Sequence, residues 1–198
     1  MVDIIISGGV VATMDEQRRV LNPGAVAIDG SEIVAVGESG ELRDAYDADR
    51  LVDASGQLVI PGLVNTHVHV PDILYRGRGK ARGLHDWLFN VKHPFVGAMD
   101  AGDHALAAEL YCRESLRNGI TTFVENAGGL GNGYDDETVE AKLSVYDRAG
   151  LRNVYANGFL DSGSDPEFES FAQTQRRKEP DVVHASEPPL ETEAALDR

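Results

Sequence analysis

The chain has little cysteine and no long hydrophobic run. Cysteine occurs once, at Cys112, which excludes an internal disulfide and a zinc site built from several thiolates. The early apolar stretch 4–14 is interrupted by a Ser-Gly-Gly triplet and follows Asp3 instead of a basic residue. Neither a signal peptide nor a membrane-spanning helix has this pattern. We therefore expect a cytoplasmic protein with no membrane partner.

Basic residues are also scarce. The sequence holds 33 Asp plus Glu against 18 Lys plus Arg, a formal net charge of −15. This excess repels nucleic acid and anionic lipid, so neither is an expected partner. The acidic residues are scattered, and none forms the Asp-x-Asp-x-Asp-Gly loop of a calcium site. The pattern indicates a solvated acidic surface of the kind that halophilic proteins carry.

Hydrophobic residues make up 42% of the chain, which is enough to bury a core. Residues 1–60 consist of short β-like runs separated by turn residues, and Asp29-Gly30 marks a tight hairpin because it tolerates positive φ angles. We expect residues 1–60 to form a small antiparallel β layer, a domain separate from residues 61–198.

Beyond Pro61 the pattern alternates between strands and helices. The expected order is strand 62–70, a long irregular stretch, helix 100–118, strand 120–125, helix 135–149 and strand 153–158. Repeated strand-helix units with apolar strands predict a parallel sheet, as in a (β/α) barrel or a doubly wound fold. The expected inward-facing residues are Ala105, Ala108, Cys112 and Leu116 on the first helix, and Val139, Leu143 and Tyr146 on the second.

The stretch "GLVNTHVHV", residues 62–70, places two histidines one residue apart. Side chains at i and i+2 of a strand point to the same face, so His67 and His69 are expected to lie together, with Val68 packed on the opposite face. Two neutral imidazoles can bind one first-row metal ion, and zinc or iron suits them better than a soft metal. By spacing alone the alternative is a pair of hydrogen-bonded histidines with no metal.

Several longer stretches resemble a known family. "VIPGLVNTHVHVPDILYRG" is similar to the segment that opens the catalytic barrel in the metal-dependent amidohydrolase superfamily, and "DASGQLVIPG" to its small β-sandwich. "HVPDILYRGRGKARGLHDWL" and "RNGITTFVENAGG" resemble the branch of S-adenosylhomocysteine, methylthioadenosine and guanine deaminases and of triazine hydrolases. The resemblance runs from Val2 to about Gly163. It implies an α/β chain: the N-terminal half of a β-sandwich followed by the first three strand-helix units of a (β/α)8 TIM barrel.

The resemblance also implies a function. His67 and His69 would be the first two ligands of a catalytic divalent metal, with Zn²⁺ favoured and Fe²⁺ as the alternative. The parent enzyme would use water activated by this metal to hydrolyse a C–N or C–Cl bond on a small heteroaromatic substrate, a purine, pyrimidine or triazine. Two alternatives stay open: a catalytically inactive truncated polypeptide, and a cyclic amidase of the same superfamily. The Asp-Trp-Leu loop argues against the cyclic amidase.

The family's later metal ligands and its acid/base residues have no counterpart in this sequence. The strand pattern is expected to stop after the third barrel strand, and the one later histidine, His184, lies in a polar tail. No catalytic residue is assigned for this reason. We expect an incomplete fragment that needs the missing C-terminal barrel residues as a partner, and homo-oligomerisation is left open.

Three further residues are weaker candidates for substrate binding. Trp87, in the long loop, could stack on a heteroaromatic ring or anchor the loop. Glu125 or its neighbour Asn126 could face the site from the end of the second barrel strand, and we select Glu125. Asn157 holds the corresponding place on the third strand. Surface or structural roles are expected for the remaining histidines that precede the tail, His85, His93 and His104.

Overall fold

The computed structural model describes residues 1–128 and 134–158. The chain separates into two compact units, Met1–Gly62 and Leu63–Arg198, and each is described by itself. The boundary expected from the sequence lay between residues 60 and 61. The described residues do not include His184, the polar stretch 161–180 or the helical pattern expected at 191–198.

The first unit is a five-stranded sheet with one short helix. Its strand order is β3-β2-β1-β4, with β5 also paired to β1. The elements are β1 (Val2–Ala12), β2 (Val20–Asp29), β3 (Glu32–Glu38), α1 (Ser39–Ala45), β4 (Ala48–Asp53) and β5 (Leu58–Val59). Ile5, Ala25, Ala27 and Leu42 form its core, so the short helix α1 covers the sheet through Leu42.

The sheet of this unit is mixed, which corrects the expectation of an antiparallel layer. Strand β2 is antiparallel to both β1 and β3, and the predicted hairpin turns at Gly30, whose φ is +56°. Strands β4 and β5 run parallel to β1. Parallel neighbours need a crossover connection, and α1, which the sequence pattern did not reveal, lies between β3 and β4 and supplies it.

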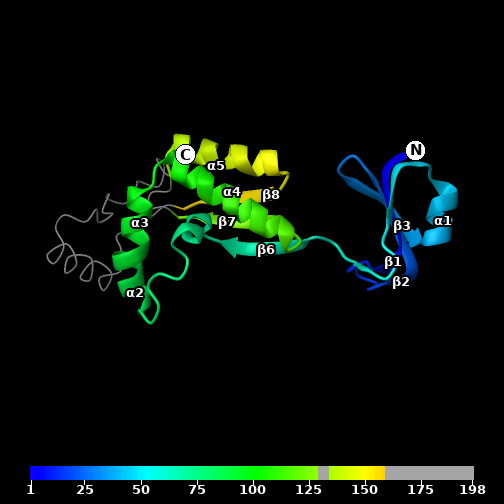
Figure 1. Cartoon of the computed structure of the whole chain (residues 1–198), viewed down its shortest axis with the longest axis horizontal. Helices are drawn as coiled ribbons and strands as arrows, with labels where there is room; N and C mark the ends of the chain where they lie inside the picture. Colours follow the sequence, from blue (N-terminus) through cyan, green and yellow to red (C-terminus); the bar gives the residue numbers. More distant parts are fainter. Residues whose placement is uncertain (129–133, 159–198) are drawn as a thin grey trace. The chain divides into compact units, whose positions relative to one another are not determined.

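The second unit begins a parallel strand-helix alternation, as the sequence predicted (Figure 1). A three-stranded sheet of order β6-β7-β8 packs against two long helices on one face. The elements are β6 (Leu63–Val68), α4 (Ala101–Arg117), β7 (Ile120–Ala127), α5 (Asp136–Ala149) and β8 (Arg152–Asn157). The helix expected after the third strand falls outside the described residues.

Local sequence signals set the ends of both long helices. Asp100 accepts a hydrogen bond from the backbone N–H of Asp103, whose carboxylate accepts one from Asp100 in return, and this capping box begins α4. Asp135 caps α5 by accepting a hydrogen bond from the backbone N–H of Thr138, without the reciprocal bond. Helix α5 ends at Gly150, whose left-handed φ of +71° is the usual conformation of a helix stop.

The core between these helices and the sheet is aromatic. Tyr111, Phe123 and Tyr146 stack edge to face with ring centroids 4.9 and 5.0 Å apart. The inward faces predicted for the helices are confirmed at Ala108, Cys112 and Tyr146, which are buried in this core, but are wrong at Leu116 and Leu143, which are 48% and 37% exposed. The inward positions include Tyr111 of α4 and, unexpectedly, the fully buried Lys142 of α5.

The segment between β6 and α4, expected to be irregular, is largely helical. It contains η1 (Val70–Tyr75), α2 (Leu84–Trp87), the π-helical turn η2 (Leu88–Lys92) and α3 (His93–Ala98). Tyr75, Val91 and Val96 form a small core of its own, against which Trp87 packs. No helix of the described residues is long and apolar enough to cross a membrane.

Candidate metal site

The histidine pair lies where β6 ends. The pairing register shifts between Asn65 and Val68: these residues, three apart, oppose Phe123 and Glu125, two apart. Such a one-residue bulge keeps Asn65 and Val68 on the helix-covered face, where Asn65 bonds to the hydroxyl of Tyr111 at 3.0 Å. His67 is thereby turned to the opposite face.

The two imidazoles meet on the face that α4 and α5 do not cover. Their ring centroids lie 5.1 Å apart at 88°, so the rings are close but not stacked. Val68 between them packs against the helix-side core, as expected from strand alternation. In parallel strand-helix barrels the carboxyl ends of the strands carry the active site, and both histidines lie at this end of β6.

Asn126, at the end of β7, is the neighbour that contacts both histidines. Its backbone carbonyl lies 2.7 Å from Nδ1 of His69, and its side-chain nitrogen lies 3.5 Å from Nδ1 of His67. The sequence interpretation preferred Glu125 over Asn126. The two-residue period of a strand could have decided between them: Phe123 belongs to the core, so Glu125 shares its face and Asn126 does not.

The electrostatic surroundings favour a neutral imidazole at His69. Its burial lowers the pKa from the ordinary value, and the positive charge of Lys92 adds to this effect. A metal ligand must be neutral, and the carbonyl of Asn126 occupies Nδ1 while leaving the lone pair of Nε2 free. The donor set therefore fits two of the positions of a first-row metal ion.

Two donors do not complete such a site. Within residues 1–128 and 134–158, no group of three or more His, Cys, Asp or Glu side chains could hold a metal ion. The further ligands that a tetrahedral ion requires are not supplied by the described part of the chain.

Glu125 lies on the other face of the sheet. It is fully buried, and its carboxylate accepts hydrogen bonds from Lys142 and, at 2.6 Å, from the hydroxyl of Tyr146. The Lys142 ammonium also lies over the rings of Tyr134 and Tyr155, 4.6 and 5.1 Å from their centroids. Burial lowers the pKa of Lys142, and Glu125 opposes this shift. The geometry gives Glu125 a role in holding α5 to the sheet.

The other two substrate-binding candidates are Asn157 and Trp87. Among the described residues, both contact groups other than the two histidines. The side-chain oxygen of Asn157 accepts a hydrogen bond of 3.2 Å from the backbone of Tyr134. The ring of Trp87 packs against Tyr75 and against Gly79, where a Cβ would come within 2.6 Å of the indole. Trp87 belongs to helix α2, not to a loop as expected, and Gly79 makes room for it.

Of the surface or structural roles expected for His104, the structure shows a buried, structural position. It is 2% exposed, its ring lies 4.6 Å from that of Tyr134, and burial together with Lys142 lowers its pKa to about 4. His93 is buried as well, against Phe89 at 5.0 Å. His85 is exposed on α2. Position 104 points inward together with Ala107 and Ala108.

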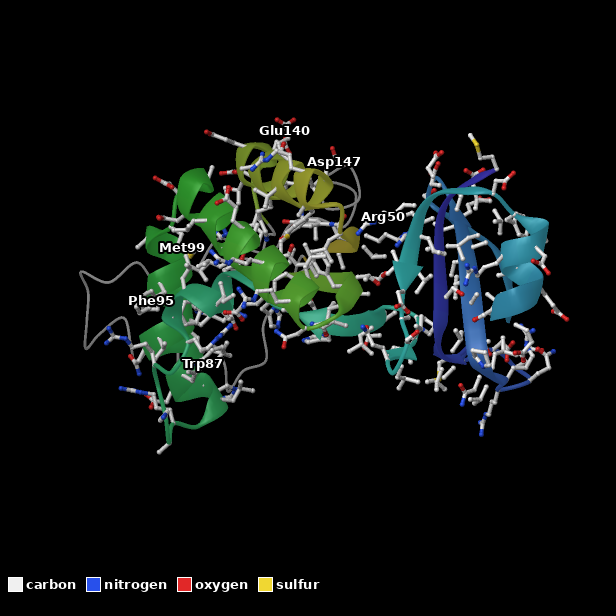
Figure 2. The ribbon with its side chains drawn as sticks, turned by 45° about the vertical axis from the view of Figure 1, so that its right-hand side comes forward. Arg50, Trp87, Phe95, Met99, Glu140 and Asp147 are labelled. Carbon is white, nitrogen blue, oxygen red and sulfur yellow. The ribbon has the colours of Figure 1, made fainter. Side chains whose placement is uncertain are left out.

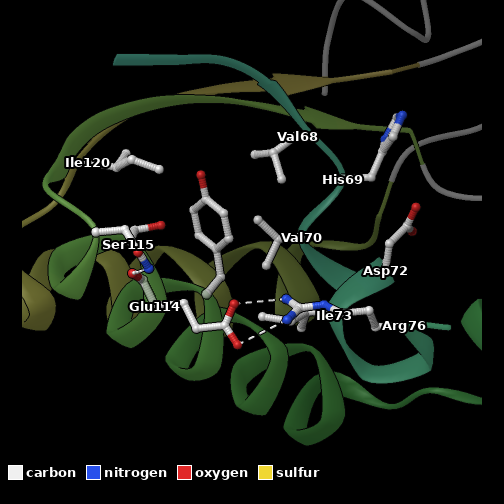
Figure 3. A pocket seen from close by; sticks show the side chains of 11 residues that line it. Val68, His69, Val70, Asp72, Ile73, Arg76, Glu114, Ser115 and Ile120 are labelled. Atoms are coloured by element: carbon white, nitrogen blue, oxygen red, sulfur yellow. Dashed lines mark hydrogen bonds and ion pairs between the residues drawn. The ribbon is translucent and has the colours of Figure 1, made fainter. Parts of the chain in front are cut away.

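A cavity of about 460 Å³ opens between β6, η1 and α4 (Figure 3). Arg76 and Glu114 form a two-bond ion pair at its rim, with distances of 3.2 and 2.8 Å. The imidazole of His69 points away from Val70 and Ser115, which line the cavity. His69 nevertheless belongs to the residues that line this cavity, and His67 does not.

Taken together, the bulged strand β6 and the parallel strand-helix repeats define the opening part of a (β/α)8 barrel, with the histidine pair at the carboxyl end of its first strand. The barrel is not closed within the described residues. The chain belongs to the Amidohydrolase family, whose sequence model matches residues 58–194.

The relatives that match this chain include deaminases of adenosine derivatives. The chain is 34% identical to a 5'-deoxyadenosine deaminase of Methanosarcina barkeri over 81% of its own length. It is 36% identical to a 5-methylthioadenosine/S-adenosylhomocysteine deaminase of Syntrophobacter fumaroxidans over 62% of its length. These matches cover 34% and 28% of the relatives, so the chain spans about a third of their length.

Solved structures show the same fold. Atrazine chlorohydrolase of Arthrobacter aurescens, complexed with zinc, is 26% identical and superposes with a TM-score of 0.72. That match covers 93% of this chain and 44% of the chlorohydrolase. An adenosine deaminase of Xanthomonas campestris with bound zinc is also 26% identical, with a TM-score of 0.67 over 92% of this chain and 41% of the deaminase.

Proposed function

We propose that this chain supplies the first half of the active site of a metal-dependent hydrolase that removes an amino or chloro substituent from a purine, pyrimidine or triazine ring. The observation that carries the proposal is the pair His67 and His69 at the carboxyl end of the first barrel strand, with their ring centroids 5.1 Å apart. The deaminase relatives and the zinc-complexed chlorohydrolase neighbour support the substrate class and the metal.

Each described residue of the site has a defined task in this proposal. His67 and His69 hold the cation, which we expect to be Zn²⁺, with Fe²⁺ as the alternative. When bound, such a cation activates water for attack on a ring carbon. Asn126 of β7 contacts both imidazoles. The remaining ligands and the acid/base residue must come from outside the described residues, since these contain no third metal-binding group near the pair.

Metal binding is the first test. Zn²⁺ bound to the chain is measured by equilibrium dialysis for the wild type, for His67→Ala/His69→Ala and for His85→Ala. His85 is a matched control because it is an exposed histidine on another element, helix α2. The proposal requires that the double substitution abolish binding and that the control retain it. Equal binding by all three proteins would refute it.

Turnover is the second test. Ammonia release from 5'-deoxyadenosine and chloride release from a chlorotriazine are measured with the metal-loaded protein. Release that disappears in His67→Ala/His69→Ala supports the hydrolase. A chain that binds metal through both histidines and releases neither product supports the second candidate, a catalytically inactive polypeptide, which the incomplete ligand set of the described residues favours.

Cellular setting is part of the proposal. We place the protein in the cytoplasm and attribute its net charge of −15 to a solvated acidic surface of the halophilic kind. Glu140 and Asp147 illustrate such a surface, because they lie on the side of α5 that faces away from the strands (Figure 2). A homo-oligomer is compatible with this acidic surface.

A further inference from the structure

We propose that Asn126 is a positioning residue that selects the tautomers of both histidines, so that each ring keeps its Nε2 lone pair for one divalent cation. The inference rests on the proposed function and adds to it the residue that orients the ligands. It comes from two contacts, the 2.7 Å distance from the Asn126 carbonyl to Nδ1 of His69 and the 3.5 Å distance from its carboxamide to Nδ1 of His67.

The contact with His69 defines one tautomer. A backbone carbonyl only accepts hydrogen bonds, so Nδ1 of His69 must carry the proton and donate it to Asn126. A neutral imidazole has one proton, which leaves Nε2 as the lone pair. This bond comes from the main chain and is independent of the side chain at position 126.

The contact with His67 depends on the side chain. An asparagine amide offers a donor and an acceptor on the same carbon, and a half turn about its last bond exchanges the two. With the amide oxygen toward His67, Asn126 accepts the Nδ1 proton and Nε2 of His67 becomes a lone pair as well. In the structure the amide nitrogen, a donor, lies 3.5 Å from Nδ1 of His67, and the half turn places the oxygen on that side without backbone movement.

The strands explain why this position is suited to the task. Asn126 stands beside Glu125 and Ala127, both buried on the helix face, which directs its own side chain to the face of the histidines. Residues that bond to the second nitrogen of a ligating histidine fix its orientation, and their loss costs about 10- to 100-fold in metal affinity. Asn126 is placed to do this for two ligands at once.

The test compares Asn126→Leu, which removes the amide at similar size, with Asn126→Asp, which keeps an acceptor. Asn118→Leu is the matched control, because Asn118 also loses a hydrogen bond but lies at the opposite end of β7. Affinity for Zn²⁺ is measured by competition with a coloured chelator. We expect Asn126→Leu to weaken binding at least about 10-fold, and Asn126→Asp and Asn118→Leu to stay within about 3-fold of the wild type or bind more tightly.

Nitrogen-15 spectra of labelled histidine provide a readout that a merely structural role would not change. The wild type should show Nδ1–H at His69, with or without Zn²⁺, and Nδ1–H at His67 in the Zn²⁺ complex. Asn126→Leu should lose the protected Nδ1–H of His67 and keep that of His69. The inference is overturned by an Nε2–H tautomer at His69 in the wild type, or by wild-type affinity in Asn126→Leu.

Failure of this inference can be told apart from failure of the proposed function. Zn²⁺ binding that survives His67→Ala/His69→Ala refutes the metal site itself. Binding that requires both histidines but ignores position 126 refutes only the role of Asn126. The wild-type spectra need no variant, so the result does not depend on whether Asn126→Leu folds.

Discussion

The two faces of the β6-β7-β8 sheet differ in almost every respect. The helix-covered face buries Phe123, Glu125 and Ala127 of the central strand, all 1% exposed or less. The opposite face leaves Val64 and Val154 59% and 57% exposed and carries the histidine pair. The covered face forms the core of the unit, and the open face carries the candidate metal ligands. Substitutions on the covered face should therefore change the free energy of unfolding more than substitutions on the open face.

The largest effect is expected from breaking the buried ion pair. Lys142→Met leaves the Glu125 carboxylate without its cation in a dry environment, and we expect a loss of about 3–5 kcal/mol in the free energy of unfolding. Urea unfolding followed by the fluorescence of Trp87, the single tryptophan, measures it. Adding Glu125→Gln should recover much of the loss. A cost below about 1 kcal/mol for Lys142→Met would show that the pair is not an anchor.

A pH effect of intermediate size should come from His104, also on the covered side. Its folded pKa is lowered from 6.5 to about 4 by burial and Lys142, against the opposing charges of Asp103, Asp135 and Asp100. Between these values the unfolded chain binds the extra proton, so stability is present above pH 6.5 and is lost as the pH falls toward 4.

We expect this histidine to account for about 1–3 kcal/mol of the difference in unfolding free energy between pH 7 and pH 4.5. His104→Leu should flatten the pH dependence by that amount. Urea titrations at the two pH values measure the change. An unchanged slope in the variant would mean that His104 is hydrated in the folded state.

A single substitution made on both faces compares them directly. Val145→Thr puts a hydroxyl into the core between α5 and the sheet, where Val145 is 4% exposed, and should cost about 1–2 kcal/mol. Val154→Thr makes the same change on the open face and should cost less than about 0.5 kcal/mol. Equal costs, measured by urea unfolding, would show that something covers the open face in solution.

The smallest effect on stability is expected at the metal site itself. His67→Ala removes an exposed ring, and we expect the free energy of unfolding without metal to change by no more than about 0.5 kcal/mol. Zn²⁺ should stabilise the wild type and not the variant, because only binding to the folded state shifts unfolding. Thermal unfolding with and without Zn²⁺ measures both. A large destabilisation without metal would make His67 a structural residue.

Much of the second unit was predictable because its signals are local. Asp100, Asp135 and Gly150 mark helix ends through bonds that span three or four residues, and alternation brought His67 and His69 together. The errors arose where a partner distant in sequence decides. Lys142 of α5 turns inward because Glu125 of β7 neutralises it, and β4 is parallel to β1, a strand from the start of the chain.

The sequence by itself determined the strand-helix order, the helix caps, the acidic balance and the motif with its two histidines, since each depends on neighbouring residues or on composition. Only the tertiary structure decided that Asn126 and not Glu125 faces this pair. That choice depends on a bulge in β6 and on the pairing register of β7, and register is set by which face α4 and α5 cover. Burial of one face by α4 and α5 therefore left Asn126 and the two histidines together on the other.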